Sequence, residues 1–248
     1  GDGGGWGFPE FPSGNGGGQD GPGRDYDNLP HGGGGGGTGP VNNNPPPRGQ
    51  ENIIHNQVQN PYLRSLVNQA ISTDIDDMIS RIITTLDEDI FVQISVIDAP
   101  ETTHLEAAET DLIKIPNSNT ITGTITLSTN VLSISTKEYA VTTVIHEFIH
   151  SYLKYIGQSN RLRELEHEQM AIKYINPMVH YLTTAFGLTS RDATALCWIG
   201  VNDASSYENS TDFSYPGGSI TKSELEDIYR DYVSGRLGES ICSPGNLE

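Results

Sequence analysis

The stretch Thr136–Tyr155 reads TKEYAVTTVIHEFIHSYLKY, and the rest of the chain is interpreted from it. Apolar residues surround three polar ones, His146, Glu147 and His150. A hydroxyl residue at its start and Gly157 shortly after its end are typical helix caps. The segment therefore predicts a helix with buried flanks, in which three buried polar side chains would be costly unless they have a purpose.

The polar trio has the spacing of a metal site. Residues four apart lie on one face of a helix, so the imidazoles of His146 and His150 can reach the same ion. Glu147 follows the first ligand and projects toward the open coordination position, where a carboxylate can act as general base. The pattern predicts a zinc hydrolase site with Glu147 as the catalytic residue. The alternative is a pair of partly buried histidines beside a carboxylate in an ordinary core helix.

A catalytic zinc ion usually has three protein ligands, so a third is expected downstream of the helix. The metzincin pattern requires a glycine and a histidine where this chain has Leu153 and Ile156, which excludes that class. A thermolysin-like pattern would supply a glutamate from a later helix. The candidates for that role are Glu164, Glu166 and Glu168, but the sequence around them does not match the pattern.

A histidine in the next predicted helix is the better candidate for the third ligand. His167 lies 17 positions after His150, close to the start of that helix. A loop of this length lets the helix fold back across the metal site. We predict His167 as the third ligand, with Glu168 or Glu164 as the substitute. The alternative is a solvated histidine in a charged stretch.

The segment Val144–Leu153 (VIHEFIHSYL), followed by His167, resembles the SprT-like zinc metallopeptidases. The downstream residues that share in the resemblance are Met170, Ala171, Tyr174 and Ile175. The resemblance covers roughly residues 60–187. It implies zinc held by His146, His150 and His167, Glu147 as general base, and peptide-bond hydrolysis in a protein or peptide substrate.

The chain also departs from the SprT-like pattern. Glu168 stands where a glycine often follows the third histidine, and Cys197 and Cys242 are too few to build the zinc ribbon that many members carry. Some members act on proteins attached to DNA, a role that the acidic charge of this chain disfavours. The chain looks more like secreted bacterial proteins that use only the core peptidase module.

Composition divides the chain near residue 60. The first fifty residues hold 19 of the 28 glycines and 8 of the 14 prolines. Such a segment has little apolar surface to offset its ordering entropy. We therefore expect residues 1–60 to be a disordered Gly/Pro/Asn-rich linker. Residues 61–248 are long enough to build the hydrophobic core of one zincin-like metallopeptidase domain.

The net charge of −18 bears on partners and location. Lysine and arginine are scattered singly, which argues against nucleic acid because phosphate binding depends on clustered cations. The sequence contains neither a stretch of the length of a membrane span nor an apolar secretory signal. A flexible leader before a globular domain is typical of secreted or surface-tethered proteins, so we expect a secreted or cell-envelope location. The two cysteines leave open whether a disulfide forms.

The periodicity predicts an α+β fold with a small sheet early and helices later. The expected helices cover residues 61–86, 136–156, 164–186 with a bend at Pro177, 190–206 and 223–234. The expected strands cover residues 90–97, 111–115 and 121–134, and residues 207–219 are expected to be a loop. Serine and threonine alternate with apolar residues over 121–130, so this strand is predicted to lie at the sheet edge and to pair with an extended substrate.

Several features of the chemistry stay open. A hydrolase of this class needs a donor to the developing oxyanion, and the candidates are Tyr174, His180, Tyr181 and Tyr207. Two other interpretations stay open. One is the same catalytic module delivered to another cell as a toxin or effector, and the other is a non-catalytic binding domain that keeps zinc as a scaffold.

Overall fold

The structure, a computed structural model, describes residues 54–73, 75–102, 106–116, 118, 120–157 and 162–238. The expected linker, residues 1–60, lies largely outside the described residues. Its last part is folded, because Ile54–Asn56 form strand β1, which pairs in parallel with β2 (Val92–Ala99). The side chain of Ile54 is buried, and its backbone N–H donates to Asp87. The boundary expected at residue 60 is therefore too late.

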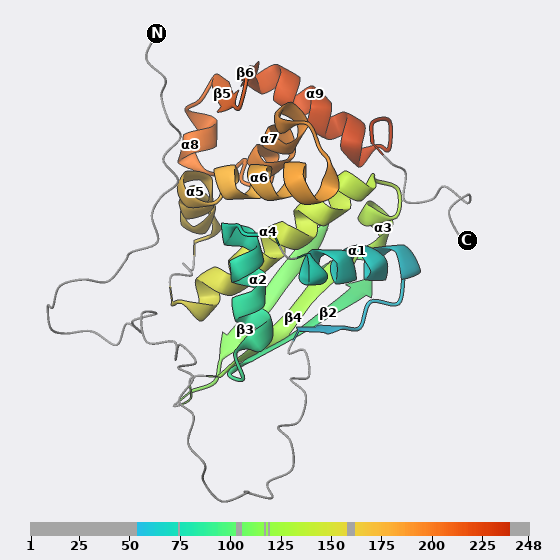
Figure 1. Cartoon of the computed structure of the whole chain (residues 1–248), viewed down its shortest axis with the longest axis vertical. Coiled ribbons are helices and arrows are strands. Elements are labelled where there is room, and N and C mark those ends of the chain that lie inside the picture. Colours follow the sequence, from blue (N-terminus) through green and yellow to red (C-terminus); the bar gives the residue numbers. More distant parts are fainter. Residues whose placement is uncertain are drawn as a thin grey trace, which may run out of the picture. The chain divides into compact units, whose positions relative to one another are not determined.

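One four-stranded sheet has the order β1-β2-β4-β3, where β3 is Ala108–Lys114 and β4 is Ile121–Ser128 (Figure 1). Strands β2 and β4 are parallel, and β3 runs antiparallel to β4. The prediction that 121–130 is the edge strand is wrong, because β4 lies between β2 and β3. Its alternation reports one buried and one more solvated face, which an internal strand can also have. The outer strand on that side is β3.

The pairing of β3 with β4 depends on a glycine. A Cβ built on Gly123 would lie 2.0 Å from the carbonyl oxygen of Asp111 and 2.7 Å from the side chain of Leu112. A side chain at this position would push β3 away from β4. Glycine inside a strand often marks such a close approach of backbone.

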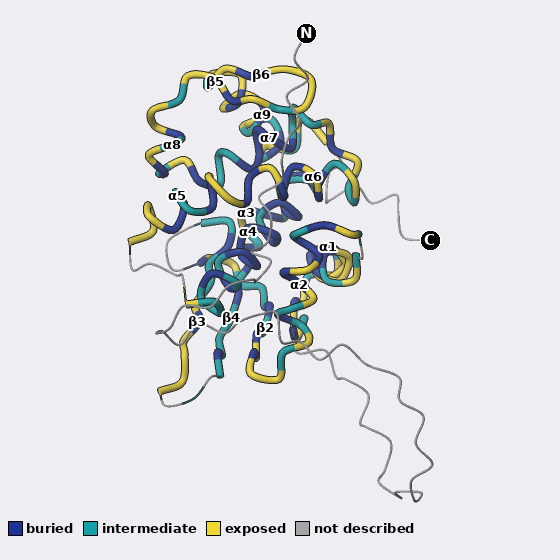
Figure 2. The backbone as a smooth tube through the Cα atoms, turned by 60° about the vertical axis from the view of Figure 1, so that its left-hand side comes forward, coloured by how far each residue is buried: buried dark blue, intermediate teal, exposed yellow. Residues whose placement is uncertain are grey.

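Helix α4 (Lys137–Tyr155) is the central helix of the fold (Figure 1). Thr136 caps it by accepting a hydrogen bond from the N–H of Tyr139. Helices α1 (Pro61–Ser72) and α2 (Met78–Glu88) contact it, as does strand β3. Phe148 and Ile149 are fully buried within it. Figure 2 shows the buried core running through this helix and the inward sides of its neighbours.

The predicted helix over 61–86 is two helices, α1 and α2. Asp77 begins the second by accepting a hydrogen bond of 2.8 Å from the N–H of Ser80. The apolar stripe runs through both helices because both pack against α4. Periodicity therefore predicted the buried face and missed the break, which an aspartate cap marks.

The predicted helix over 164–186 is also divided, into α5 (Arg163–Lys173) and α6 (Ile175–Phe186). The break falls at Tyr174, three residues before the predicted bend at Pro177. Proline clashes with the carbonyl four residues earlier, but it is tolerated in a first helical turn. The chain therefore ends one helix upstream of the proline and starts another.

The C-terminal part is mainly helical. Its remaining elements are α7 (Ser190–Ile199), α8 (Ser205–Glu208), the hairpin β5 (Asp212–Tyr215) with β6 (Gly218–Thr221), and α9 (Lys222–Val233). The predicted helix over 190–206 is thus too long, and the predicted loop over 207–219 contains a hairpin. The predicted strand over 121–134 likewise ends in the short helix α3 (Thr129–Leu132).

The α+β class, with a small N-terminal sheet and a mainly helical C-terminal part, is confirmed. Within the part of the chain that the structure describes, no helix is long and apolar enough to cross a membrane. Cys197 is buried and is not bonded to any described residue, and Cys242 lies outside the described residues.

Candidate metal centre

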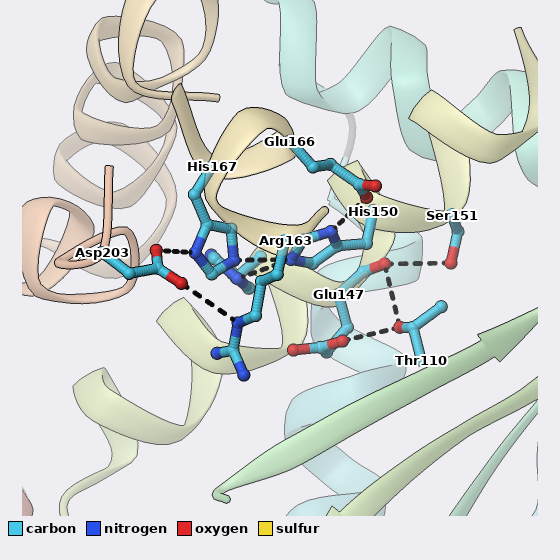
Figure 3. Close-up of polar contacts among 9 residues, drawn as sticks. Thr110, Glu147, His150, Ser151, Arg163, Glu166, His167 and Asp203 are labelled. Carbon is cyan, nitrogen blue, oxygen red and sulfur yellow. Dashed lines mark hydrogen bonds and ion pairs between the residues drawn. The ribbon is translucent and has the colours of Figure 1, made fainter. Parts of the chain in front are cut away.

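Three histidines meet at one point between α4 and α5 (Figure 3). The Nε2 atom of His150 lies 2.9 Å from Nε2 of His146 and 3.1 Å from Nε2 of His167. All three candidate ligand atoms lie within 4.8 Å of one another. His146 and His150 are one turn apart on α4, whereas His167 comes from the second turn of α5. The three residues that the sequence singled out as ligands are therefore brought together.

Carboxylates hold the outer nitrogens of two of these rings. Nδ1 of His150 lies 2.5 Å from Oε1 of Glu166, and Nδ1 of His167 is hydrogen-bonded to Asp203. An ionised carboxylate only accepts hydrogen bonds, so each Nδ1 carries a proton, and in the neutral ring Nε2 then keeps its lone pair. This is the arrangement in which outer carboxylates orient metal-binding imidazoles.

Burial favours the neutral form of His146 and His167, which is the form that metal binding requires. Burial lowers the pKa of His146 well below its usual value, and the neighbouring imidazoles of His150 and His167 add to the effect. Burial also lowers the pKa of His167, although its bond to Asp203 opposes the change. Ligand nitrogens at about 2.0–2.1 Å from a tetrahedral ion would lie about 3.4 Å apart, close to the separations observed. The three-histidine group can therefore hold a metal ion.

Glu147 is placed beside the cluster by a contact with the edge strand. Thr110 of β3 donates a hydrogen bond of 2.6 Å to Oε2 of Glu147 (Figure 3). Burial raises the pKa of Glu147, which favours its protonated form. Glu147 also lines the cleft at the centre. The carboxyl group is therefore anchored through one oxygen and available to exchange a proton.

Arg163, the first residue of α5, joins the two sides of the centre. It is hydrogen-bonded to Glu106, and its Nε lies 3.6 Å from Oδ2 of Asp203. Although burial opposes the charge, the hydrogen bond and ion pair with Glu106 raise the pKa of Arg163, so the guanidinium stays charged. Since arginine carries five N–H donors, these two contacts leave donors for the cleft that it lines.

A cleft of about 360 Å³ opens at the centre. It is lined by residues of helices α3, α4, α5, α6, α7 and α9, by the turn after α7, and by the start of β3 with the segment that leads into it. His146, Glu147 and Arg163 lie along it. None of the predicted oxyanion donors lies among its lining residues. The hydroxyl of Tyr181 donates to the carbonyl of Ala70, and that of Tyr207 to Glu226.

The two substitutes for the third ligand lie elsewhere. Glu168 accepts hydrogen bonds from the backbone N–H and the hydroxyl of Ser206. Glu164 is exposed and is outside the metal-binding group. Neither contacts the histidine cluster through a described interaction, so His167 is the residue of this helix that meets the other two.

Sequence reasoning missed the residues that surround the cluster. Asp203 lies in a turn inside a predicted helix, Thr110 lies outside the predicted strand 111–115, and Arg163 falls in a predicted loop. Glu166 was considered as a ligand, whereas its carboxylate holds His150 instead. The available signal was that Glu166 stands next to His167 in the sequence. This neighbourhood does not show whether the carboxylate binds the metal or holds a histidine.

Comparison with known proteins finds no relative of this chain. No family model, no curated protein and no solved structure matches the chain.

Proposed function

We propose that the chain is a zinc-dependent metallopeptidase that hydrolyses peptide bonds with Glu147 as general base. The observation that carries the proposal is the position of Glu147. It lies in a cleft next to three histidines that can hold one metal ion, and it is bonded to an edge strand. A scaffold site that only stabilises a fold has no use for a carboxylate placed in this way.

Zinc fits the donor set because imidazole nitrogen is one of its usual ligands, and three protein ligands leave a position open. When bound, zinc supplies a Lewis acid that makes water acidic enough to attack at neutral pH. His146, His150 and His167 would hold it, and Glu166 and Asp203 would orient two of the rings. The proposed relationship to the SprT-like peptidases rests on the same histidines and on the sequence around them.

Glu147 has the proton-transfer role in this proposal. Thr110 donates to Oε2, which leaves Oε1 to accept a proton from the attacking water. The same carboxyl group then returns the proton to the leaving amine. The raised pKa of Glu147 suits this role, because a general base works best when its pKa is near the working pH.

Arg163 is the proposed donor to the carbonyl oxygen of the substrate as negative charge develops there. It lines the cleft together with Glu147 and His146, and the described residues that line the cleft include no other lysine or arginine. Its ion pairs with Glu106 and Asp203 fix the guanidinium at the centre. Donors fixed in advance stabilise developing charge more than mobile ones do.

The proposed substrate is an extended peptide that pairs with β3. Strand β3 is the outer strand of the sheet, and it contacts α4 as well as β4. Backbone pairing with a sheet edge gives affinity that does not depend on the peptide sequence. Thr110 lies on this strand and bonds to Glu147, so a peptide beside β3 would pass next to the general base.

The test is the Glu147→Gln variant, assayed for cleavage of an unfolded protein substrate and for zinc content. Glutamine keeps the size and the bond from Thr110 but cannot take a proton. We expect an activity loss of about 10²–10⁴-fold with zinc retained. The matched control is Glu138→Gln, which lies on the same helix outside the cleft lining and should keep full activity. Equal cleavage by the Glu147→Gln variant and the parent would refute the mechanism.

A further inference from the structure

The cleft extends from the metal centre along the N-terminal half of α4. The α4 residues that line it are Tyr139, Thr142, Thr143, His146 and Glu147, which follow the pattern i, i+3, i+4, i+7 and i+8 and share one face. The cleft therefore has two ends. At the metal end lie the ionisable side chains of Glu106, Glu147 and Arg163. The other end, around Tyr139, is called the side pocket below.

The walls of the side pocket are apolar. They come from four helices and consist of Val131, Met178, Leu196, Cys197 and Val233. Met178, Leu196 and Cys197 are almost completely buried, at 1 %, 3 % and 1 % exposure. These residues belong to the core of the fold, so the walls of the pocket are held in place by packing. The pocket is therefore formed before a ligand binds.

The polar groups of the side pocket are satisfied within the protein. The hydroxyls of Thr142 and Thr143 donate to the carbonyls of Glu138 and Tyr139 on their own helix. The hydroxyls of Tyr139 and Tyr229 lie 3.4 Å apart and pair with each other. The charge of Glu106 reaches Tyr139, but this carboxylate is already paired with Arg163. A charged group in the pocket would therefore be buried without an available opposite charge, which is costly. An apolar side chain carries no charge, so its burial in the pocket has no such cost.

We propose that the side pocket binds one large apolar side chain of the substrate, phenylalanine-like or leucine-like, next to the peptide bond that is cleaved. The position next to the cleaved bond rests on the proposed peptidase function, whereas the chemistry of the bound side chain does not. The rings of Tyr139 and Tyr229 meet edge to face at 5.6 Å and present aromatic surface to such a side chain. His146 and Glu147 line the same cleft, so a side chain in the side pocket would have its own backbone close to the metal end.

The first test measures binding and requires no cleavage. N-acetyl-phenylalaninamide and N-acetyl-alaninamide are titrated into the full zinc-loaded chain, and binding is followed by NMR. The phenylalanine probe should bind at least about tenfold more tightly, because burial of one large apolar side chain has an effect of this size. N-acetyl-lysinamide should bind no better than the alanine probe. Equal binding of the phenylalanine and alanine probes, or tighter binding of the lysine probe, would overturn the inference.

A matched pair of variants locates the binding. Val233→Phe fills the pocket and should remove the advantage of the phenylalanine probe, as should Val131→Phe if the first variant folds poorly. Ile134→Phe adds the same ring at a side chain that is 66 % exposed and outside the cleft lining, and it should keep the advantage. An unchanged advantage in both pocket variants would mean that the probe binds elsewhere.

Cleavage gives a second and independent readout. Two peptides that differ in one residue, phenylalanine or alanine beside the cleaved bond, are compared by kcat/KM, and a third peptide with tryptophan at that position is added for the Tyr229→Ala variant. Val233→Phe should shift the preference toward alanine, and Tyr229→Ala should shift it toward tryptophan over phenylalanine. A general loss of stability would not shift the two preferences in opposite directions. If the parent cleaves neither peptide, the proposed function fails, while probe binding still decides the chemistry of the pocket.

Discussion

Helices α4 and α5 both carry histidines of the centre, but they hold them differently. Helix α4 is 19 residues long, begins at the side-chain cap of Thr136, and is buried along most of its length. Helix α5 is 11 residues long and has no side-chain cap bond. Its exposed positions include two large apolar residues, Leu165 and Ile172, at 51 % and 70 % exposure.

The difference shows what each histidine depends on. The positions of His146 and His150 follow from helix geometry in a core element. The position of His167 depends on Asp203, which comes from the turn after α7 and is 36 positions away. Local sequence thus brings the α4 residues to one face, although Glu166 and Thr110 hold their side chains, whereas tertiary contacts bring His167 to the centre at all. Substitutions in the two halves should therefore have different consequences.

The largest effect is expected when the α5 half loses its ligand. His167→Ala should weaken zinc binding by more than about 100-fold, beyond the loss that a supporting residue causes. Zinc affinity is measured by competition with a chelator of known strength. Glu164→Ala removes an exposed side chain of the same helix and should leave the affinity unchanged. Similar losses in the two variants would remove His167 from the ligand set.

The next largest effect concerns Arg163, which connects the two halves. Arg163→Met keeps much of the length of the side chain and removes its donors, so kcat should fall about 10²-fold while KM changes little. The variant is assayed with zinc bound. Arg191→Met is the matched control, because Arg191 is similarly exposed and pairs with Glu224 away from the cleft. A variant with the kcat of the parent would exclude Arg163 as the donor.

A smaller loss is expected from the outer contact of the α5 half. Asp203→Asn keeps the shape of the side chain but weakens its acceptance from Nδ1 of His167, so zinc affinity should fall about 10- to 100-fold. The measurement is the same chelator competition. Asp227→Asn changes an exposed carboxylate that pairs with Arg230 and serves as control. No change in the Asp203→Asn variant would mean that tertiary contacts do not hold this ring.

The smallest effect tests the α4 half through close packing. A Cβ built on Gly200 would lie 3.1 Å from Nδ1 of His146, which is tight. Gly200→Ala should therefore press on that ring and weaken zinc binding by about two- to tenfold, at or below the low end of what a lost supporting group costs. Gly187→Ala is the control for a general loss of stability: its φ of +71° strains an alanine, but its Cβ would meet nothing within 4 Å, so zinc affinity should not change. Tighter zinc binding by the Gly200→Ala variant would contradict the packing described.

The sequence predicted the α4 half well because its signals are local. Spacing on one helix places His146, Glu147 and His150 on the same face whatever the rest of the chain does. The third ligand could be proposed only among alternatives, since His167, Glu164 and Glu168 share one helix. Which of them turns inward depends on how α5 packs, and no periodicity encodes that packing.

The parts that could not be predicted depend on contacts between distant segments. The alternation over 121–130 shows which side chains of the strand are buried, but it does not show which strands lie beside it. The sequence therefore predicts an edge strand there, whereas the edge strand is β3. Gly123, which lets β3 approach, looked like one more position in the alternating pattern. Asp203 and Thr110 reach the centre from a turn and an edge strand that carry no motif. Long-range pairing decided each of these features.

The metal content of the full chain, purified without added metal or chelator, tests the central claim most directly. Elemental mass spectrometry of the parent should find about one zinc ion per chain, as three ligands around one ion require. The His167→Ala variant, purified in the same way, should hold much less. A parent that contains no zinc and takes up none when zinc is added would contradict the account, and the histidine cluster would then be a packed core feature of α4 and α5.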